Sequence, residues 1–573
     1  MCGQACFSKL NLLNIMMIPI QKYLCGVLLV FLSAINCAYS QPAKSAIASA
    51  HPMATSAGFE ILQAGGNAFD AAIAVSSTLA VVEPYSSGMG GGGFWLLHRA
   101  SDKKQIMIDG REKAPLKSHR DMYLDKDGNV VPGLSVNGPL SAGIPGQPAA
   151  LVHMAKKYGQ LPLAKSLAPA IRAAEQGFKV TPYYQKMARF RLEPLQKSSA
   201  AAALFLKDNE VPPVGHLIIQ QDLANTLRAI AKQGNDGFYK GVIAKQLVKG
   251  TQEAGGIWSE KDLAQYRIVE RKPLVTNYKG YRITSVAPPS SGGTALIQIF
   301  NMLNQFELDK LSSVKRKHVI VEAMRRAYRD RAEFLGDSDF VKVPLDKLTD
   351  LEYAKGLITN LDMKQATPSS ALKPVVSKDS GFHTSHFSVL DKQGNRVSAT
   401  LTINYPFGSC FVPPGTGVLL NDEMDDFSAK PGIPNVYGLV GAEANAIVPG
   451  KRMLSSMSPS FVENDKQLAI IGTPGGSRII TMVLHGILGF IDGKDAKAIV
   501  TQPRYHHQYL PDHIQYEPGA LSWYQRWRLK RMGHQLKELK DTYGNMHVVI
   551  WDKQKNRISA ASDPRGEGMA LVR

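Results

Sequence analysis

The chain has 573 residues, of which 44% are hydrophobic and 20% are charged. This is the composition of an ordinary soluble protein with ample material for a core, and it excludes a chain too polar to fold. The formal net charge of +19 favours adsorption to anionic envelopes or to nucleic acid. Because no recognised nucleic-acid-binding module accompanies that charge, we expect no nucleic-acid partner.

Residues 1–40 are predicted to be a secretory signal peptide. Lys22 precedes an apolar run over residues 23–32, and Ala38-Tyr39-Ser40 places small residues where a signal peptidase cleaves. A membrane anchor is the second choice, because the apolar run is shorter than the ~20 residues that a span needs. Translation starting at Met16 or Met17 would give a more usual signal. We therefore expect a periplasmic or secreted protein without a stable membrane span in its mature form.

Loss of the signal peptide changes the charge and the cysteine content. Lys9 and Lys22 leave with it, so the formal net charge falls from +19 to +17. Four of the five cysteines also leave, and Cys410 alone remains. An exported protein with one cysteine has no internal disulfide, so its stability must come from burial. We expect Cys410 to be a small buried hydrophobe.

Several elements can be placed along the mature chain. A helix is predicted over residues 55–63. Asn67, together with Asp70, is predicted to cap a second helix, and that helix runs to about Val82. Residues 317–335 predict a long amphipathic helix. The densest basic run, residues 526–531, is predicted to lie on a surface helix with a solvated face.

Glycines at residues 88–93 satisfy the G-x-G-x-x-G dinucleotide pattern, and Asp109 follows at about the fingerprint's distance. Residues 94–97, Phe-Trp-Leu-Leu, predict a strand, whereas a pyrophosphate site needs a helix N-terminus there. The glycines are therefore predicted to allow tight backbone packing near an active site.

The most informative residue is Thr384. Residues 361–381 are rich in proline, small polar residues and charge, which predicts an exposed loop. After Thr384 the side chains alternate, a turn follows at 391–395, and alternation resumes to Ile403, which predicts a β-hairpin. A hydroxyl at the junction of a loop and a strand is what self-cleavage requires, although threonine is also simply common in strands.

Metal and cofactor sites are not expected. The His506-His507 pair and the His383/His386 pair lack a spaced carboxylate or cysteine partner. There is also no Walker A sequence, no C-x-x-C pair and no G-x-S-x-G elbow.

Collinear motifs place Thr384 in a wider pattern. In the second half of the chain they are residues 384–388 (TSHFS), 402–404 (TIN), 419–427 (LLNDEMDDF), 431–438 (PGIPNVYG), 454–459 (LSSMSP) and 472–478 (GTPGGSR). In the first half they are residues 51–55 (HPMAT), 83–84 (EP), 88–94 (GMGGGGF), 109–112 (DGRE) and 288–293 (PPSSGG). Together they resemble the γ-glutamyltranspeptidase family over roughly Ser45 to Arg573.

This resemblance implies a fold and a processing event. Helices and antiparallel strands are both abundant but segregated, which by itself indicates an α+β fold. The family sharpens this to the four-layer αββα sandwich of N-terminal nucleophile hydrolases. It also implies cleavage between His383 and Thr384, giving a large subunit, 41–383, and a small subunit, 384–573. Because strands of one piece would need partners from the other, we expect two interwoven subunits.

The resemblance also implies a γ-glutamyltransferase that hydrolyses glutathione and passes the glutamyl group to water, amino acids or peptides. Thr384 is the expected nucleophile, Thr402 its positioning partner, and Gly475 and Gly476 the oxyanion donors. A glutamyl α-carboxylate is expected at Arg111, Ser455 and Ser456. Its α-ammonium is expected at Asn404, Glu423 and Asp426, under a lid, 431–440, latched by Tyr437.

Two other functions are open. A glutaryl cephalosporin acylase would share the nucleophile and the fold, although the lid and the Ser455-Ser456 pair favour γ-glutamyl compounds. An uncut, basic homologue that binds the cell envelope would belong to another functional class. Each residue named for the site also has a purely structural interpretation when it is taken singly.

Overall fold

The hairpin that begins at Thr384 lies inside a large antiparallel sheet. The computed structural model describes residues 41–372, 384–430, 432–439 and 441–573. Strand β9 (Ser385–Leu390) pairs with β10 (Arg396–Thr402), and Asp391 Oδ1 accepts the backbone N–H groups of Gln393 and Asn395 at 2.9 Å in the turn. The predicted hairpin is therefore confirmed. The predicted signal peptide, 1–40, and His383 lie outside the described residues.

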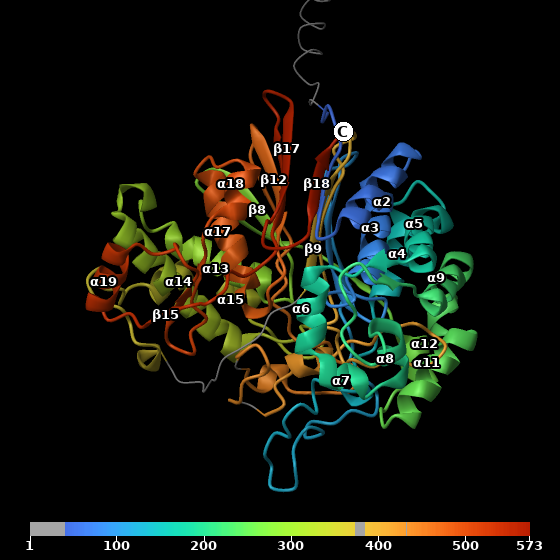
Figure 1. Cartoon of the computed structure of the whole chain (residues 1–573). Coiled ribbons are helices and arrows are strands. Elements are labelled where there is room, and N and C mark those ends of the chain that lie inside the picture. The colour runs from blue at the N-terminus through green and yellow to red at the C-terminus, as the bar shows by residue number, and fades with distance from the viewer. Residues whose placement is uncertain (1–40, 373–383, 431, 440) are drawn as a thin grey trace, which may run out of the picture. The chain divides into compact units, whose positions relative to one another are not determined.

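Seven strands form the first sheet, and neighbouring strands come from distant parts of the chain (Figure 1). All neighbours are antiparallel. In spatial order they are β18 (Met569–Val572), β1 (Ala46–Ser49), β9, β10, β2 (Gly92–Arg99), β3 (Lys104–Gly110) and β6 (Val269–Arg271). The strands that follow Thr384 thus lie between strands that precede it, so the predicted interweaving of the two segments is present.

Six antiparallel strands form the second sheet. Their order is β17 (Arg557–Ser562), β16 (His547–Asp552), β12 (Gln467–Gly472), β11 (Ser460–Glu463), β8 (Tyr281–Ser285) and β7 (Leu274–Tyr278). Two small sheets contain β13 (Tyr505–His506), β14 (Ile514–Tyr516) and β15 (Leu536–Glu538), and β4 (Phe178–Lys179) with β5 (Leu217–Ile218).

The two large sheets pack face to face because the side chains between them are small, apolar or hydrogen-bonded to the facing sheet. Ser388 Oγ donates to His547 O at 3.1 Å, and Ser398 Oγ donates to Ile471 O at 3.2 Å, so polar residues of the first sheet bond to the second. The alternate residues Phe387 and Val389 point to the other face, where they join a separate apolar core. This alternation is the period-2 pattern of the sequence.

Helices cover the outer face of each sheet, which completes four layers, αββα (Figure 1). Beside the first sheet lie α2 (Pro52–Gln63), α3 (Ala68–Val82), α4 (Gln147–Lys157) and α5 (Leu163–Gln176), followed by α6 (Pro182–Phe190), α7 (Leu192–Gln196), α8 (Ser199–Phe205), α9 (Gln221–Gln233), α10 (Asp236–Tyr239), α11 (Gly241–Glu253) and α12 (Glu260–Gln265). On the side of the second sheet lie α13 (Gly292–Leu303), α14 (Ser313–Phe334), α15 (Leu345–Leu348), α16 (Leu351–Leu357), α17 (Ile479–Ile491), α18 (Ala496–Thr501) and α19 (Trp523–Arg531). Of the helices described, none is long and apolar enough to cross a membrane.

The predicted helices are confirmed with shifted ends. Asn67 accepts from the backbone N–H of Asp70, and Asp70 accepts from that of Asn67, so the predicted capping pair opens α3. Helix α14 begins at Ser313, four residues before the predicted start. Residues 94–97 lie in β2, as predicted, and a Cβ at Gly91 would lie 2.1 Å from Thr402 O. The glycine run therefore allows the close backbone approach that was expected.

The prediction of an exposed loop over residues 361–381 is confirmed for most of its described part, 361–372, where half of the residues are exposed and two are buried. Ala366 and Ser369 are buried, and residues Ser369–Ala371 form a 3-10 turn. Ser369 Oγ donates to Tyr509 O at 2.6 Å and accepts from Arg325 at 2.7 Å. Long-range partners from α14 and from the chain after Thr384 thus bond to Ser369, which the local composition could not reveal.

One buried bond ties α3 to the start of β9. Ser385 Oγ donates to Glu83 Oε2 at 2.5 Å, and Glu83 is the residue that ends α3. Burial raises the pKa of Glu83 from 4.5 to about 7, although the bond from Ser385 opposes this rise. The residue next to Thr384 is thus held by a carboxyl group that protonates near neutrality.

Glu83 should therefore make the fold less stable as the pH rises. Between pH 4.5 and about 7 the folded state keeps a proton that the unfolded state has lost, so this group's contribution to the free energy of unfolding falls through that window. The size is about 3 kcal/mol, from roughly 1.4 kcal/mol per pKa unit. Glu83→Gln keeps the acceptor but cannot ionise, and urea unfolding at pH 4.5 and pH 8 should show a smaller loss for it than for the wild type. The exposed Glu253→Gln is the control, and parallel curves for wild type and Glu83→Gln would contradict the assignment.

Candidate active site

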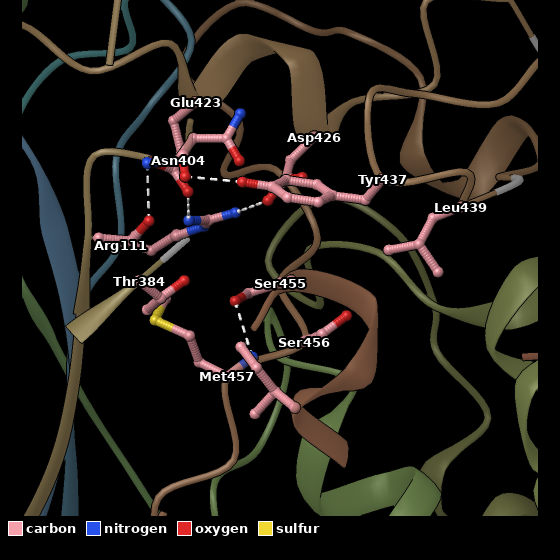
Figure 2. Close-up of a pocket in the computed structure, with 13 residues that line it drawn as sticks. Arg111, Thr384, Asn404, Glu423, Asp426, Tyr437, Leu439, Ser455, Ser456 and Met457 are labelled. Carbon is pink, nitrogen blue, oxygen red and sulfur yellow. Dashed lines mark hydrogen bonds and ion pairs between the residues drawn. The ribbon is translucent and has the colours of Figure 1, made fainter. Parts of the chain in front are cut away.

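One pocket gathers almost all of the residues that the sequence nominated (Figure 2). The nominated residues in its wall are Arg111, Thr384, Thr402, Asn404, Glu423, Asp426, Tyr437, Ser455, Ser456 and Gly476. Gly475 precedes the last of these in the chain. Side chains more than 300 positions apart in sequence therefore meet around Thr384.

The strand register sets Thr402 opposite Thr384. Leu401 pairs with Ser385, so the next position along the antiparallel ladder brings together Thr402 and Thr384. Thr402 Oγ1 accepts from the backbone N–H of Asn404 at 2.7 Å, and its hydroxyl also bonds to the Glu423 side chain. Thr384 is buried, with 6% of its surface exposed. The hydroxyl of Thr384 thus lies in the pocket, directly before the first residue of β9.

Arg111 is fully buried at the centre of an ionic network. It donates from Nη1 to Glu423, and from Nη2 to Asp426 Oδ2 at 2.5 Å. Burial disfavours the guanidinium charge, but these acids outweigh that cost and raise the pKa of Arg111. The arginine predicted to hold a carboxylate is thus paired with two acids predicted to hold an ammonium.

Acids outnumber the guanidinium at this point of the pocket. Glu112 is also buried, with Oε2 3.5 Å from Arg111 Nη1. Burial raises the pKa of Glu423 to about 7 and that of Glu112 well above its ordinary value. Among the described residues, Glu423 Oε2 and both Glu112 oxygens have no hydrogen-bond partner. Because buried carboxyl oxygens that lack a hydrogen-bond donor are costly, this part of the pocket favours an added cationic donor, even though both acids form ion pairs with Arg111.

The two serines present hydroxyls to the pocket. Ser455 Oγ accepts from Met457 N at 3.1 Å, and Ser456 Oγ accepts from Arg331 Nη2 at 3.3 Å. With its lone pairs engaged in this way, each hydroxyl can still donate its proton to a ligand anion. Sequence patterns did not nominate Arg331, because it lies within the charged repeat of α14 and its burial comes only from tertiary packing.

Tyr437 closes one side of the pocket from the segment predicted to be a lid. Its hydroxyl donates to Asn404 O at 2.6 Å, and its backbone N–H bonds to Asn435 Oδ1 at 3.0 Å. Asn435 Nδ2 also donates to Asp426 Oδ1 at 3.1 Å. Residues 432–439 are therefore tied to the acids beneath them. Asn404 itself has a left-handed backbone, with φ of 72°, and its amide donates to Asp422 O at 2.9 Å.

Gly475 and Gly476 form a turn before α17. Their φ angles are 140° and 54°, and a Cβ at Gly476 would lie 2.5 Å from the Tyr437 ring. A larger residue would therefore collide with the segment above it. The turn leads into the N-terminus of α17, where backbone N–H groups favour negative charge.

Three apolar residues in the pocket wall were missed: Leu439, Met457 and Ile479. Leu439 comes from the segment above the pocket, Met457 directly follows the two serines, and Ile479 is the first residue of α17. No chemical motif marks such residues, and their proximity to nominated residues was the one signal that could have found them.

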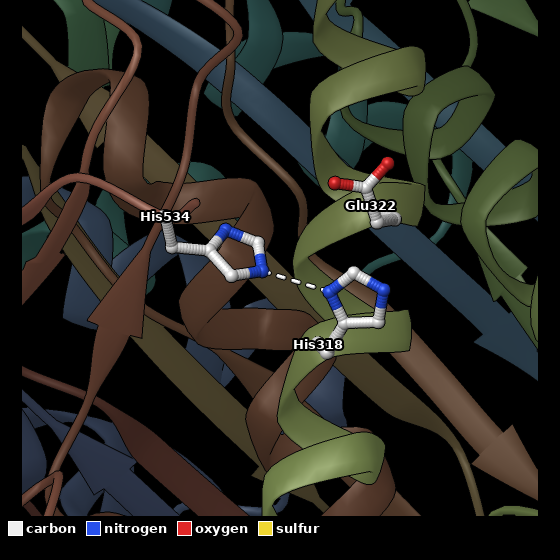
Figure 3. A group of neighbouring side chains, drawn as sticks. All are labelled: His318, Glu322 and His534. Atoms are coloured by element: carbon white, nitrogen blue, oxygen red, sulfur yellow. Dashed lines mark hydrogen bonds between the residues drawn. The ribbon is translucent and has the colours of Figure 1, made fainter. Parts of the chain in front are cut away.

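A second titratable cluster lies away from the pocket and joins α14 to the segment after α19 (Figure 3). Ligand-type atoms of His318, Glu322 and His534 lie within 4.8 Å of one another. His318 Nδ1 is 2.8 Å from His534 Nε2, and Glu322 accepts from Thr367 N at 3.2 Å and from Arg326 at 2.5 Å. A cation here would have to break these bonds beside a guanidinium. His318 bonds to Asp362 O and Glu322 bonds to Thr367 N, so the cluster holds residues 362–367 against α14, and we call it the clamp.

Comparison with known proteins gives one consistent result. The family described as Gamma-glutamyltranspeptidase matches residues 54–572. The glutathione hydrolase proenzyme of Escherichia coli (strain K12) is 42% identical over 525 residues, covering 91% of this chain and 90% of that protein.

Solved structures agree with this result. The cephalosporin acylase from Bacillus halodurans superposes with a TM-score of 0.81 at 29% identity, covering 93% of this chain and 96% of that one. The Helicobacter pylori gamma-glutamyltranspeptidase gives a TM-score of 0.55 at 43% identity, covering 57% of this chain and 94% of that one. The four layers are thus those of the N-terminal nucleophile hydrolases, and the chain belongs to the gamma-glutamyltranspeptidase family.

Proposed function

We propose that this protein is a self-cleaving, exported γ-glutamyltransferase that also hydrolyses glutathione. The precursor is cut between His383 and Thr384, so that residues 41–383 and 384–573 remain together as a heterodimer. No cofactor takes part. The predicted signal peptide directs the protein to the periplasm or the medium, without a membrane span in the mature form.

The observation that carries this proposal is that Thr384 lies in a buried pocket whose wall contains charged side chains of both signs. Arg111, Glu423 and Asp426 offer both signs of charge beside the strand end that carries the hydroxyl. A γ-glutamyl compound has a zwitterionic end and a reactive amide a few bonds away. Few small molecules match both features.

Self-cleavage comes first, because a threonine hydroxyl is a weak nucleophile without a base. Thr384 Oγ attacks the carbonyl carbon of His383, the bond from that carbon to the Thr384 nitrogen breaks, and the nitrogen takes up a proton. Water then hydrolyses the resulting ester. The freed α-amine, whose unperturbed pKa is about 7.7 to 8.0, becomes the base for the neighbouring hydroxyl.

Transfer repeats the attack on the γ-carbonyl of the substrate. The amine takes the hydroxyl proton and gives it to the departing amine product, which leaves a γ-glutamyl ester on Thr384. Backbone N–H groups of Gly475 and Gly476 would stabilise the oxyanion, worth roughly 3 kcal/mol per donor. Water or the amine of an amino acid or peptide then accepts the glutamyl group.

The zwitterionic end of the substrate exchanges partners with the internal ion pairs. Its α-ammonium replaces the guanidinium as the donor to Glu423 and Asp426, with Asn404 beside them. Its α-carboxylate takes the released fork of Arg111 and the hydroxyls of Ser455 and Ser456. Since charges of both signs enter together, the pocket keeps its balance and no buried charge loses its partner.

The segment over residues 431–440 is proposed to be a lid with Tyr437 as its latch. The bond from the Tyr437 hydroxyl to Asn404 O would hold the lid over the bound glutamyl group. Excluding water in this way favours amine acceptors over hydrolysis.

Two alternatives compete with this proposal. A glutaryl cephalosporin acylase is favoured by the superposition on an acylase structure, but its acyl group lacks the ammonium for which the surplus acids are suited. An uncut envelope-binding homologue would explain the basic charge, but it would give no reason for burying ionic groups around Thr384.

Replacement of the nucleophile tests self-cleavage. Thr384→Ala should stay as one chain on denaturing electrophoresis and have no transferase activity, because it lacks the attacking oxygen. Wild type should run as two pieces, and Edman sequencing of the smaller should begin Thr-Ser-His-Phe-Ser. Thr384→Ser keeps a hydroxyl and an amine and is the matched control, so it should still be cut. Thr402→Ala should slow cleavage about tenfold, from one lost hydrogen bond. Normal cutting of Thr384→Ala would overturn the mechanism.

Two donors that differ at the α-carbon test the substrate class. Wild type should turn over a γ-glutamyl anilide at least tenfold faster than a glutaryl amide, which has no α-ammonium. Asp426→Asn should raise KM for the γ-glutamyl donor about 10- to 100-fold, the value of one charge-assisted bond, and change the glutaryl reaction little.

The controls for this comparison are Asp426→Glu, which should recover part of the loss, and the exposed Glu443→Gln, which should behave as wild type. Electrophoresis of each variant shows whether it still folds and cuts itself. Equal losses on both donors, with normal cutting, would favour the acylase alternative.

A further inference from the structure

Helix α19 presents an unusual outer face. Trp523 is 72% exposed, Tyr524 47% and Trp527 45%, although large aromatic side chains are rarely so accessible. The three lie within one nine-residue helix. The basic run was predicted to be only a solvated face, and that interpretation does not account for these aromatic residues.

The helix is two-sided. Leu529 is fully buried and fixes the inner side, where α19 packs near α14 (Figure 1). At 100° per residue, Trp527 and Arg531 project almost opposite Leu529. The other two aromatic residues flank them on the outer side. Folding has therefore used one side of α19 and left the aromatic side to solvent.

Positive charge borders the aromatic face. From Ser522 to Lys540 the sequence has six lysine and arginine residues and one acid, Glu538. Arg528 and Arg531 lie over the Trp527 ring, at 5.8 and 5.0 Å from its centre, so their charges stay beside the aromatic surface. Arg526 lies 3.7 Å from Glu538, the one acid of this stretch, so the stretch carries a net positive formal charge.

We propose that α19 is a peripheral membrane-binding helix that takes the anionic phospholipid surface as its partner. Tryptophan and tyrosine favour the level of the lipid headgroups, and lysine and arginine favour negatively charged headgroups. A short helix with aromatic residues on its outer face and cations beside them lies in the plane of the interface without crossing it. Charge complementarity selects lipid phosphates, and the exposed indoles select a surface into which they can insert.

A nucleic acid would satisfy the positive charge, but insertion of the indoles requires an apolar layer. The proposal does not depend on the activity of the pocket, because none of its residues lines that pocket. Binding through α19 would hold the strongly basic protein at a lipid surface without a helix that crosses the membrane.

Vesicle sedimentation with the processed wild-type protein tests this proposal. Vesicles of phosphatidylglycerol and phosphatidylcholine should bring the protein down at low salt, vesicles of phosphatidylcholine alone should not, and 0.5 M NaCl should release much of it. Tryptophan fluorescence gives a second readout. Trp95, Trp258 and Trp551 are buried, so a blue shift on adding vesicles reports on Trp523 and Trp527.

Two variants separate the aromatic and the charged contributions. Trp523→Ser with Trp527→Ser should weaken binding about tenfold and abolish the blue shift. Arg526→Gln, Arg528→Gln, Lys530→Gln and Arg531→Gln together should reduce binding at least tenfold. A charge-matched control replaces four exposed lysines elsewhere by glutamine: Lys156, Lys232, Lys245 and Lys261. That control should still bind vesicles, and all the variants should keep normal turnover of the γ-glutamyl anilide.

Three results would overturn the proposal. The first is that wild type does not sediment with anionic vesicles. The second is that the lysine control loses as much vesicle binding as the variant with four α19 cations replaced. The third is that wild type binds double-stranded DNA at least as tightly as vesicles, with no blue shift in either case. The last result would assign the face to polyanions instead of to a bilayer.

Discussion

Backbone pairing on both sides of β9 is the constraint on which the rest of the structure depends. This strand bonds to β1 on one side and to β10 on the other, and β10 bonds to β2. A break before Thr384 therefore frees a chain end without freeing a strand, because the strands before and after the break share one sheet. The same pairing fixes the position of Thr384, so the fold can turn a backbone nitrogen into a terminal amine without losing the geometry around it.

The second constraint is the group of charged side chains buried around Arg111, and burying these charges lowers the stability of the fold. Arg111, Glu112, Glu423 and Asp426 are buried together, and burial raises the pKa values of all three acids. A core of this size could be more stable with apolar residues there, since buried ion pairs rarely repay their desolvation. The network is therefore best explained by a ligand that brings charges of both signs and takes over the internal pairs.

Much of this could be predicted from the sequence, for identifiable reasons. The hairpin after Thr384 and the Asn67–Asp70 cap are local, so side-chain alternation and capping chemistry were sufficient to predict them. The pocket residues were predicted from motifs that occur in the same order as in the γ-glutamyltranspeptidase family. Arg331 and the clamp of His318, Glu322 and His534 depend on packing between distant segments, and no local pattern marks them. The burial of Ala366 and Ser369 was missed for the same reason, because the partners of Ser369, Arg325 and Tyr509, lie far away in sequence.

The protonation of Glu83 links the fold to the proposed chemistry. Its carboxyl bonds to Ser385, directly beside Thr384, and burial raises its pKa to about 7. An ionised carboxylate near a terminal amine would stabilise the ammonium form, which cannot act as a base. A group that stays largely protonated below neutral pH can hold Ser385 in place without adding that negative charge. Because Glu83 ionises at about pH 7, just below the unperturbed pKa of about 7.7 to 8.0 of an α-amine, it is largely charged once that amine is a free base, and its charge would then oppose loss of the amine's proton.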